Sequence, residues 1–168
     1  MEKNPPNIAQ LVYKALIFDF FTYDYVKKKN KYIKHSLLIV IIGSLAAGFG
    51  TYSFTNHLGI LKQLISSVLS WLLISALIYI IGVRIFNYDS EYKTLLRTIG
   101  LAYSPMLLNI FAFIPYVGSY IIIISTLWLF FTTIYAVKHT LNSSKFISLI
   151  IILLAIIPYI MIPFLIIR

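Results

Sequence analysis

The chain has 168 residues, of which 60% are hydrophobic and only 11% are charged. A soluble domain is about half apolar and about a quarter charged, and a soluble core of this length cannot bury so much apolar surface, so the composition indicates an integral membrane protein. It excludes disordered and collagen-like chains, and the lack of cysteine excludes disulfides, thiolate metal sites and cysteine nucleophiles.

Residues 1–34 form a polar and aromatic arm ahead of the first long apolar segment. Asn7 is a candidate N-cap for a helix that begins at Ile8, because apolar residues follow at helical spacing. Aromatic residues and then a run of lysines in residues 27–31 come next. This pattern is typical of a short amphipathic helix at the membrane interface, in contact with anionic lipid of the inner leaflet. A helix packed against the membrane bundle is the alternative.

Five apolar segments then predict an all-α bundle of five transmembrane helices, with residues 35–168 as one membrane domain. The expected spans are residues 35–54, 60–83, 95–114, 119–137 and 146–167. Each holds about 20 mostly apolar residues, the length that crosses a hydrocarbon core about 30 Å thick. A single helix from Thr98 to Val137 would be about twice as long as the hydrocarbon core is thick, so this segment must form two spans. The proline and glycine of Pro115–Gly118 interrupt the helix between them.

The distribution of charge predicts the orientation. Of the 14 lysines and arginines, all except Lys62 and Arg168 lie in the arm or in the two loops expected on the same side as the arm. Because basic residues are retained in the cytoplasm, we expect the N-terminus inside and the C-terminus outside. This sorting accounts for the net charge of +9 without a nucleic-acid partner. Asp19 and Asp24 interrupt the first 30 residues, so we expect no cleaved signal peptide, and no lipidation motif is present.

The first expected span carries a set of small residues at helix-packing spacing. They are Gly43, Ala47, Gly48 and Gly50. Small side chains let two helix backbones approach closely in a membrane, where lipid supplies no hydrophobic drive for association. The sequence therefore predicts a packing face here. The partner helix belongs either to the same chain or to a second copy in a homo-oligomer.

The third expected span has the most unusual composition. Its notable residues are Gly100, Ala102, Pro105 and Asn109. Pro105 removes the backbone hydrogen bond to the carbonyl near Leu101, which predicts a kink. The amide of Asn109 is costly in hydrocarbon, so it should face protein or water. The kink and amide form either an interhelical packing site or part of a substrate path, and we expect Arg97 to snorkel to the inner boundary.

Residues for catalysis or ion coupling are sparse in the sequence. No aspartate or glutamate lies inside an expected span, and His35, His57 and His139 fall at three separate span ends. Proton relays and carboxylate-based ion coupling therefore have no obvious carrier, and no histidine pair has metal-ligand spacing. We expect no enzyme activity, no catalytic residue, no cofactor and no metal site.

Two segments carry a resemblance to a known family. The polar loop at residues 88–93 is followed by Gly100, Ala102 and Pro105, an arrangement that resembles the third span of the Yip family, the Ypt/Rab-interacting membrane proteins. The break at Pro115–Gly118 and Trp128 in the fourth span fit as well. The resemblance implies a five-span membrane scaffold or adaptor that acts through protein partners in membrane organisation or trafficking. Eukaryotic members bind small GTPases through a cytosolic tail longer than this arm.

The leading hypothesis is thus a prokaryotic-type Yip-like scaffold with unknown membrane-protein partners. Eleven lysines against three arginines, with abundant isoleucine, suggest an AT-rich genome, so we expect the cytoplasmic membrane of a bacterium or archaeon. The alternative is a small transporter or channel whose path passes the Pro105 kink and Asn109.

Overall fold

The computed structural model describes the backbone of residues 6–51 and 57–166, and this part of the chain contains helices and no strand. The α-helices are α1 (Ile8–Leu16), α2 (Phe20–Lys28), α3 (Ile33–Gly50), α4 (His57–Tyr79), α5 (Tyr92–Ala102), α6 (Gly118–Leu141) and α7 (Lys145–Ile166). Two 3₁₀ segments, η1 (Asn30–Tyr32) and η3 (Ser104–Phe113), precede α3 and follow α5, and a π-helical segment, η2 (Ile80–Ile85), extends α4. The all-α expectation is confirmed for these residues.

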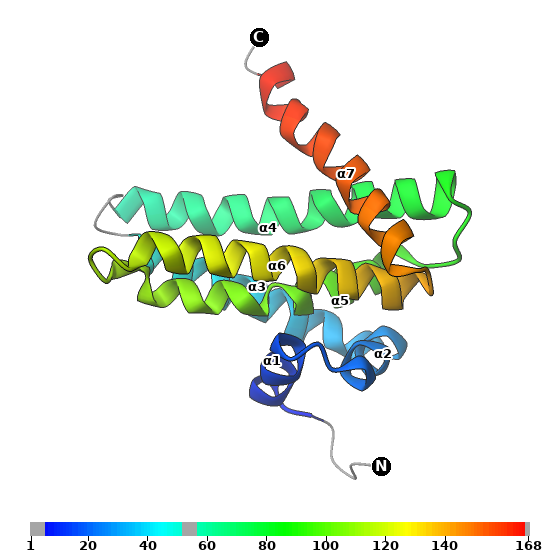
Figure 1. Ribbon diagram of the computed structural model, residues 1–168, viewed down its shortest axis with the longest axis horizontal. Coiled ribbons are helices and arrows are strands. Elements are labelled where there is room, and N and C mark those ends of the chain that lie inside the picture. Colours follow the sequence, from blue (N-terminus) through cyan, green and yellow to red (C-terminus); the bar gives the residue numbers. More distant parts are fainter. Residues whose placement is uncertain (1–5, 52–56, 167–168) are drawn as a thin grey trace.

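Four helical segments are long and apolar enough to cross a membrane: Asn30–Gly50, Gly59–Ile85, Tyr92–Phe113 and Gly118–Leu141. They lie side by side and correspond to the first four expected spans (Figure 1). The fifth expected span is not confirmed. Within the residues whose side chains are described, α7 contributes the shorter apolar stretch Lys145–Ile160, and it runs obliquely away from the other helices (Figure 1).

The arm contains two helices where the sequence predicted one. Asn7 caps α1 as expected, through a capping box in which its side chain accepts from the Gln10 backbone N–H and the Gln10 side chain accepts from the Asn7 backbone N–H. The chain then turns at Phe18, which has a positive φ of 57°, and the Asp19 carboxylate caps α2 at the N–H of Thr22, 2.9 Å away. Aspartate is favoured at the N-cap, so α2 begins directly after Asp19 as a helix separate from α1.

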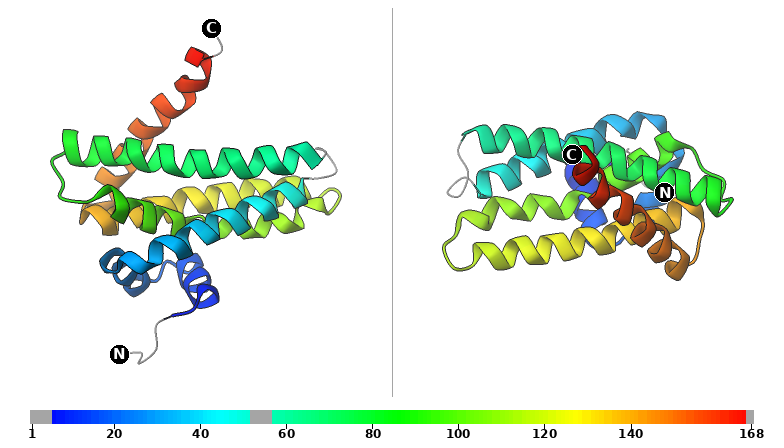
Figure 2. Two further views of the ribbon diagram at one scale, coloured as in Figure 1. Left: turned by 180° about the vertical axis from the view of Figure 1, so that it is seen from behind. Right: turned by 90° about the horizontal axis from the view of Figure 1, so that it is seen from above.

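The arm packs against the bundle. Leu11 and Ala15 of α1 and Tyr23 and Val26 of α2 are fully buried, in a cluster that includes the α5 residue Leu101 and residues of α3 and α6. Figures 1 and 2 show the arm and α7 on opposite faces of the layer formed by α3 to α6. This is the packed alternative to a purely interfacial helix. The lysines of residues 27–29 and 31 lie near the end of the arm. They are at the end of the bundle where α5 begins and α6 ends, and we call this end of the bundle the basic end.

The third span changes helix type at the expected kink. α5 ends at Ala102, and ten residues of 3₁₀ helix begin at Ser104, with Pro105 in their first turn. Runs of 3₁₀ helix longer than three or four residues are uncommon and need support from their surroundings. Here the support is local, because the carbonyl of Leu101, which Pro105 cannot bond, accepts a hydrogen bond from Ser104 Oγ at 2.7 Å.

α5 is the central helix of the structure. Every residue from Thr94 to Ala102 is buried, including Arg97 at 3% exposure. Trp71 of α4 donates from its indole N–H to the Leu96 carbonyl at 3.1 Å, which fixes α4 against α5. A charged residue in the middle of this helix is therefore buried by protein.

Candidate functional site at the junction of the arm and α5

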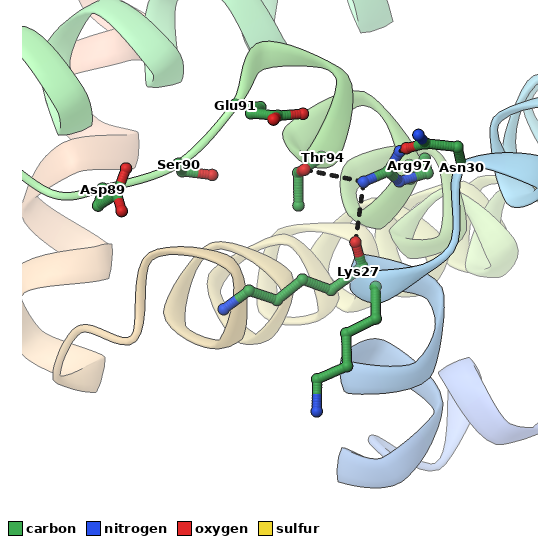
Figure 3. Close-up of a pocket in the computed structure, with 8 residues that line it drawn as sticks. Lys27, Asn30, Asp89, Ser90, Glu91, Thr94 and Arg97 are labelled. Carbon is green, nitrogen blue, oxygen red and sulfur yellow. Dashed lines mark hydrogen bonds between the residues drawn. The ribbon is translucent and has the colours of Figure 1, made fainter.

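Arg97 connects the arm to the bundle. One terminal nitrogen of its guanidinium donates to the carbonyl of Lys27 and to Thr94 Oγ1, both at 2.8 Å, and the other donates to the side-chain carbonyl of Asn30 (Figure 3). Thr94 precedes Arg97 by three residues, so the two side chains share one face of α5. We call these four residues, Lys27, Asn30, Thr94 and Arg97, the Arg97 cluster.

Lys27 extends the cluster to α6. Its ammonium donates to the His139 carbonyl at 2.9 Å and to Asn142 Oδ1 at 3.0 Å. Asn142 follows the last residue of α6 in the left-handed conformation, with φ 51°, a common helix C-cap. A cation at this place also interacts favourably with the negative end of the helix dipole. Burial lowers the pKa of Lys27, with the neighbouring Asp24 opposing and Lys28 adding to that effect. The end of α2 is thus fixed to both α5 and α6.

A polar pocket of about 460 Å³ opens beside the cluster. It is lined by Lys27, Lys28, Asn30, Asp89, Ser90, Glu91, Thr94 and Arg97. Figure 3 shows the two carboxylates and Ser90 on the loop that leads into α5, opposite the arm. Three basic and two acidic side chains therefore surround one opening at the basic end.

Two polar atoms in the lining are buried without a hydrogen-bond partner among the described residues. They are Nε of Arg97 and Oγ of Ser90. An unpaired buried polar group is costly and is rare in folded proteins. Both atoms can donate a hydrogen bond, so a carbonyl or carboxylate oxygen is the kind of group that would satisfy them.

The small residues of α3 pack within the chain. A Cβ at Gly50 would overlap the carbonyl oxygen of Asn109 in η3, and one at Gly43 would lie 3.2 Å from Met106 Cβ in the same segment. Gly48 faces Ile60 of α4 in the same way, at 3.2 Å from its Cα, and Ala47 is buried. Three of these four residues thus bring α3 close to its own neighbours η3 and α4.

Gly100, Ala102 and Asn109 of the third span each contact a different part of the bundle. Gly100 faces α3 and α4, because a Cβ there would be 2.7 Å from Ser36 Cβ and 3.1 Å from Trp71 Nε1. Ala102 offers its carbonyl to Thr132 Oγ1 of α6 at 2.8 Å. Asn109 is 2% exposed and accepts a hydrogen bond at its Oδ1 from Ser125 Oγ of α6. The polar groups of the kink are therefore bonded to neighbouring groups of the chain.

Sequence reasoning missed the Arg97 cluster. We expected Arg97 to snorkel, and its guanidinium is instead buried under the arm, where it donates to the Lys27 carbonyl. The usable signal was the Thr94-x-x-Arg97 spacing, which places a hydroxyl and a guanidinium on one face of a helix. The sequence did not indicate a role for Lys27 and Asn30, since a run of lysines has the same pattern whether it faces lipid headgroups or packs against the protein.

A comparison with family models matches residues 16–167 to the Yip1 domain. The chain belongs to the Yip1 domain family. Comparisons with curated proteins and with solved structures find no match. The Yip1 domain match begins at the last residue of α1, so α2 and the Arg97 cluster fall inside the domain and are not an appended tail. The family resemblance noted at Gly100, Ala102 and Pro105 is thereby confirmed.

Within the described residues, no group of three or more histidine, aspartate or glutamate side chains could hold a metal ion. The pocket of this Yip1 domain instead combines two carboxylates, two lysines and an arginine with an amide and two hydroxyl groups. Such an arrangement suits recognition of a polar segment by hydrogen bonds and charge.

Proposed function

We propose that this protein is a non-catalytic membrane scaffold of the Yip family whose partner docks at the pocket of the basic end. The observation that carries the proposal is the pair of unpartnered donors, Arg97 Nε and Ser90 Oγ, in a pocket bounded by both lysines and carboxylates. A partner that supplies a carbonyl or carboxylate satisfies these donors and gains charge complementarity at the rim. The partner is a membrane protein or a membrane-associated protein, because the pocket lies where spans end.

The contacts of the third span support a scaffold over a transporter. Asn109 and Ser125 bond to each other, and the Asn109 backbone is in close contact with Gly50. Polar groups that line a transport path need to face a cavity or water. The polar residues of this kink are occupied in helix packing, so the favoured role of the kink is structural.

The orientation completes the proposal. The N-terminus and the basic end lie in the cytoplasm of a prokaryotic cell, with the arm lysines near anionic headgroups. The 22 residues of α7 extend about 33 Å, enough for a fifth crossing that places the C-terminus outside. The pocket then faces the cytoplasm, where a membrane protein or a membrane-associated protein has access to it.

Site-specific photo-crosslinking in native membranes tests the proposal. A photoreactive residue replaces Asp89, at the pocket, or Tyr116, which is 96% exposed in the turn between η3 and α6 at the other end. We expect a discrete protein adduct from position 89 that weakens in the Ser90→Ala background, and none of the same mass from position 116. Only lipid adducts at position 89, or equal protein adducts at both positions, would contradict a docking pocket at the basic end.

A further inference from the structure

The arm follows α6 from its C-terminal end to its midpoint. Lys27 bonds to the His139 carbonyl near the end of α6, and the rings of Tyr23 and Phe18 lie against Tyr135, with centroids 5.5 and 5.7 Å apart. Trp128 then donates from its indole N–H to the carbonyl of Leu16 at 3.2 Å. The successive contacts show that the arm lies beside the half of the bundle next to the basic end.

The depth follows from helix geometry. Trp128 is roughly 20 Å from the C-terminal end of α6, in a helix of 24 residues that extends about 36 Å. The hydrocarbon core is about 30 Å thick, so Leu16 lies near its middle if α6 crosses it. α2, which contacts α6 from Tyr135 to His139, therefore lies in the leaflet at the basic end, and α1 meets it from the middle of the bilayer.

The exposed surface of the arm fits burial in that leaflet. The turn between α1 and α2 and the start of α2 expose Ile17 at 56%, Phe20 at 43% and Phe21 at 77%, and the Phe20 ring lies 4.7 Å from that of His139, near the end of α6. The last turn of α2 carries Lys27 and Lys28, and Lys27 also contacts His139. Large apolar side chains so exposed are unfavourable in water, whereas aromatic residues beside a lysine cluster suit the boundary between acyl chains and headgroups. Lipid is therefore the medium around the turn between α1 and α2.

We infer that the arm is a wedge in one leaflet, which makes the protein prefer membranes that are convex on the side of its basic end. Extra helix volume in one leaflet expands that leaflet relative to the other, and the bilayer relieves the mismatch by curving towards the expanded side. The preference depends on lipid alone. It goes beyond the scaffold role and requires no protein partner.

Membrane tubes pulled outwards from giant vesicles of phosphatidylethanolamine and phosphatidylglycerol test this inference. The chain has no cysteine, so a single cysteine labelled with an impermeant dye reports only molecules whose labelled end faces out. Lys145→Cys marks the basic end and Tyr116→Cys the opposite end, and both positions are exposed. We expect the Lys145→Cys population to be enriched in the tube by about twofold or more, and the Tyr116→Cys population to be depleted.

A matched pair of variants attributes the effect to the arm. Tyr135→Ala removes the ring that holds Phe18 and Tyr23, so the enrichment should fall. Phe131→Ala, at a 56% exposed position one turn away on α6, should leave it unchanged. Equal tube density for the two dye-labelled populations, or enrichment of the Tyr116→Cys population, would overturn the wedge. Because no partner protein is present, the photo-crosslinking result has no bearing on this outcome.

Discussion

Thr132 Oγ1 of α6 lies 2.8 Å from the carbonyl oxygen of Ala102 in α5. This distance is shorter than those from the same oxygen to the carbonyls of Trp128 and Leu129 in its own helix, which are 3.0 and 2.9 Å. Ala102 is the last residue of α5, immediately before the change to 3₁₀ geometry. A helix end leaves carbonyls without backbone donors, and in a membrane these need another partner. The hydroxyl from α6 supplies one, which connects the kink to the fourth span.

We therefore expect Thr132→Val to lower the free energy of unfolding by about 0.5–1.5 kcal/mol, since it keeps the shape and removes the donor. Thr133→Val is the matched control, because among the described residues the Thr133 hydroxyl bonds only to the Leu129 carbonyl of its own helix. Denaturant unfolding in detergent micelles measures both. A loss from Thr133→Val equal to that from Thr132→Val would contradict a specific role for the Ala102 contact.

The Arg97 cluster gives the second prediction. Arg97→Met leaves the Lys27 carbonyl, the Asn30 amide oxygen and Thr94 without their donor, so the arm should detach at a cost of roughly 2–4 kcal/mol. Arg97→Lys should retain only part of the attachment of the arm, because an ammonium cannot reproduce the planar set of donors of the guanidinium. Lys93→Met, on the exposed side of α5, is the control.

Limited proteolysis of the arm in detergent measures this detachment. We expect cleavage near Lys28 to be fastest in Arg97→Met, intermediate in Arg97→Lys and as slow as wild type in Lys93→Met. If Arg97→Met is cleaved no faster than Lys93→Met, Arg97 does not hold the arm.

The contact between α3 and η3 gives a third prediction. Gly50→Ala places a methyl group on the Asn109 carbonyl oxygen, which belongs to the backbone and cannot rotate away. We expect a destabilisation of roughly 1–3 kcal/mol from the forced separation of the two segments. Phe49→Ala, at a neighbouring position that is 54% exposed, should cost less. Thermal unfolding of the two variants in one detergent compares them, and a larger loss from Phe49→Ala would refute the close packing.

The side on which the C-terminus lies is a fourth prediction. A reporter fused after Arg168 should read as external, whereas one fused before Met1 should read as cytoplasmic. The positive-inside distribution and a fifth crossing by α7 together require this pair of results. A cytoplasmic reading at both ends would mean that α7 does not cross and that the membrane domain has four spans.

The sequence predicted the parts of the fold that depend on composition and spacing. Twenty apolar residues in a row identify a span wherever they occur, and Asn7 and Pro105 act on their own backbone, so the first cap and the kink could be located without a structure. Four of the five expected spans correspond to helices that are long and apolar enough to cross a membrane.

The arm and the candidate site could not be predicted in the same way, because they depend on contacts between segments far apart in the chain. Lys27 and Arg97 are 70 positions apart in the sequence, and Trp128 and Leu16, which share a hydrogen bond, are 112 positions apart. Aromatic residues beside lysines have the same pattern whether they face lipid or a neighbouring helix. Asp19 was also ambiguous, since only the turn at Phe18 makes it the start of a second helix.

The most direct test of the account is whether the arm lies on the half of the bundle at the basic end in a lipid bilayer. Phe18→Cys paired with Tyr135→Cys should crosslink rapidly with a short bis-maleimide, because the two rings are in contact at 5.7 Å. Phe18→Cys paired with Tyr120→Cys, in the first turn of α6, should not. Efficient crosslinking of the first pair alone is the predicted result, and equal or absent crosslinking of the two pairs would contradict the account.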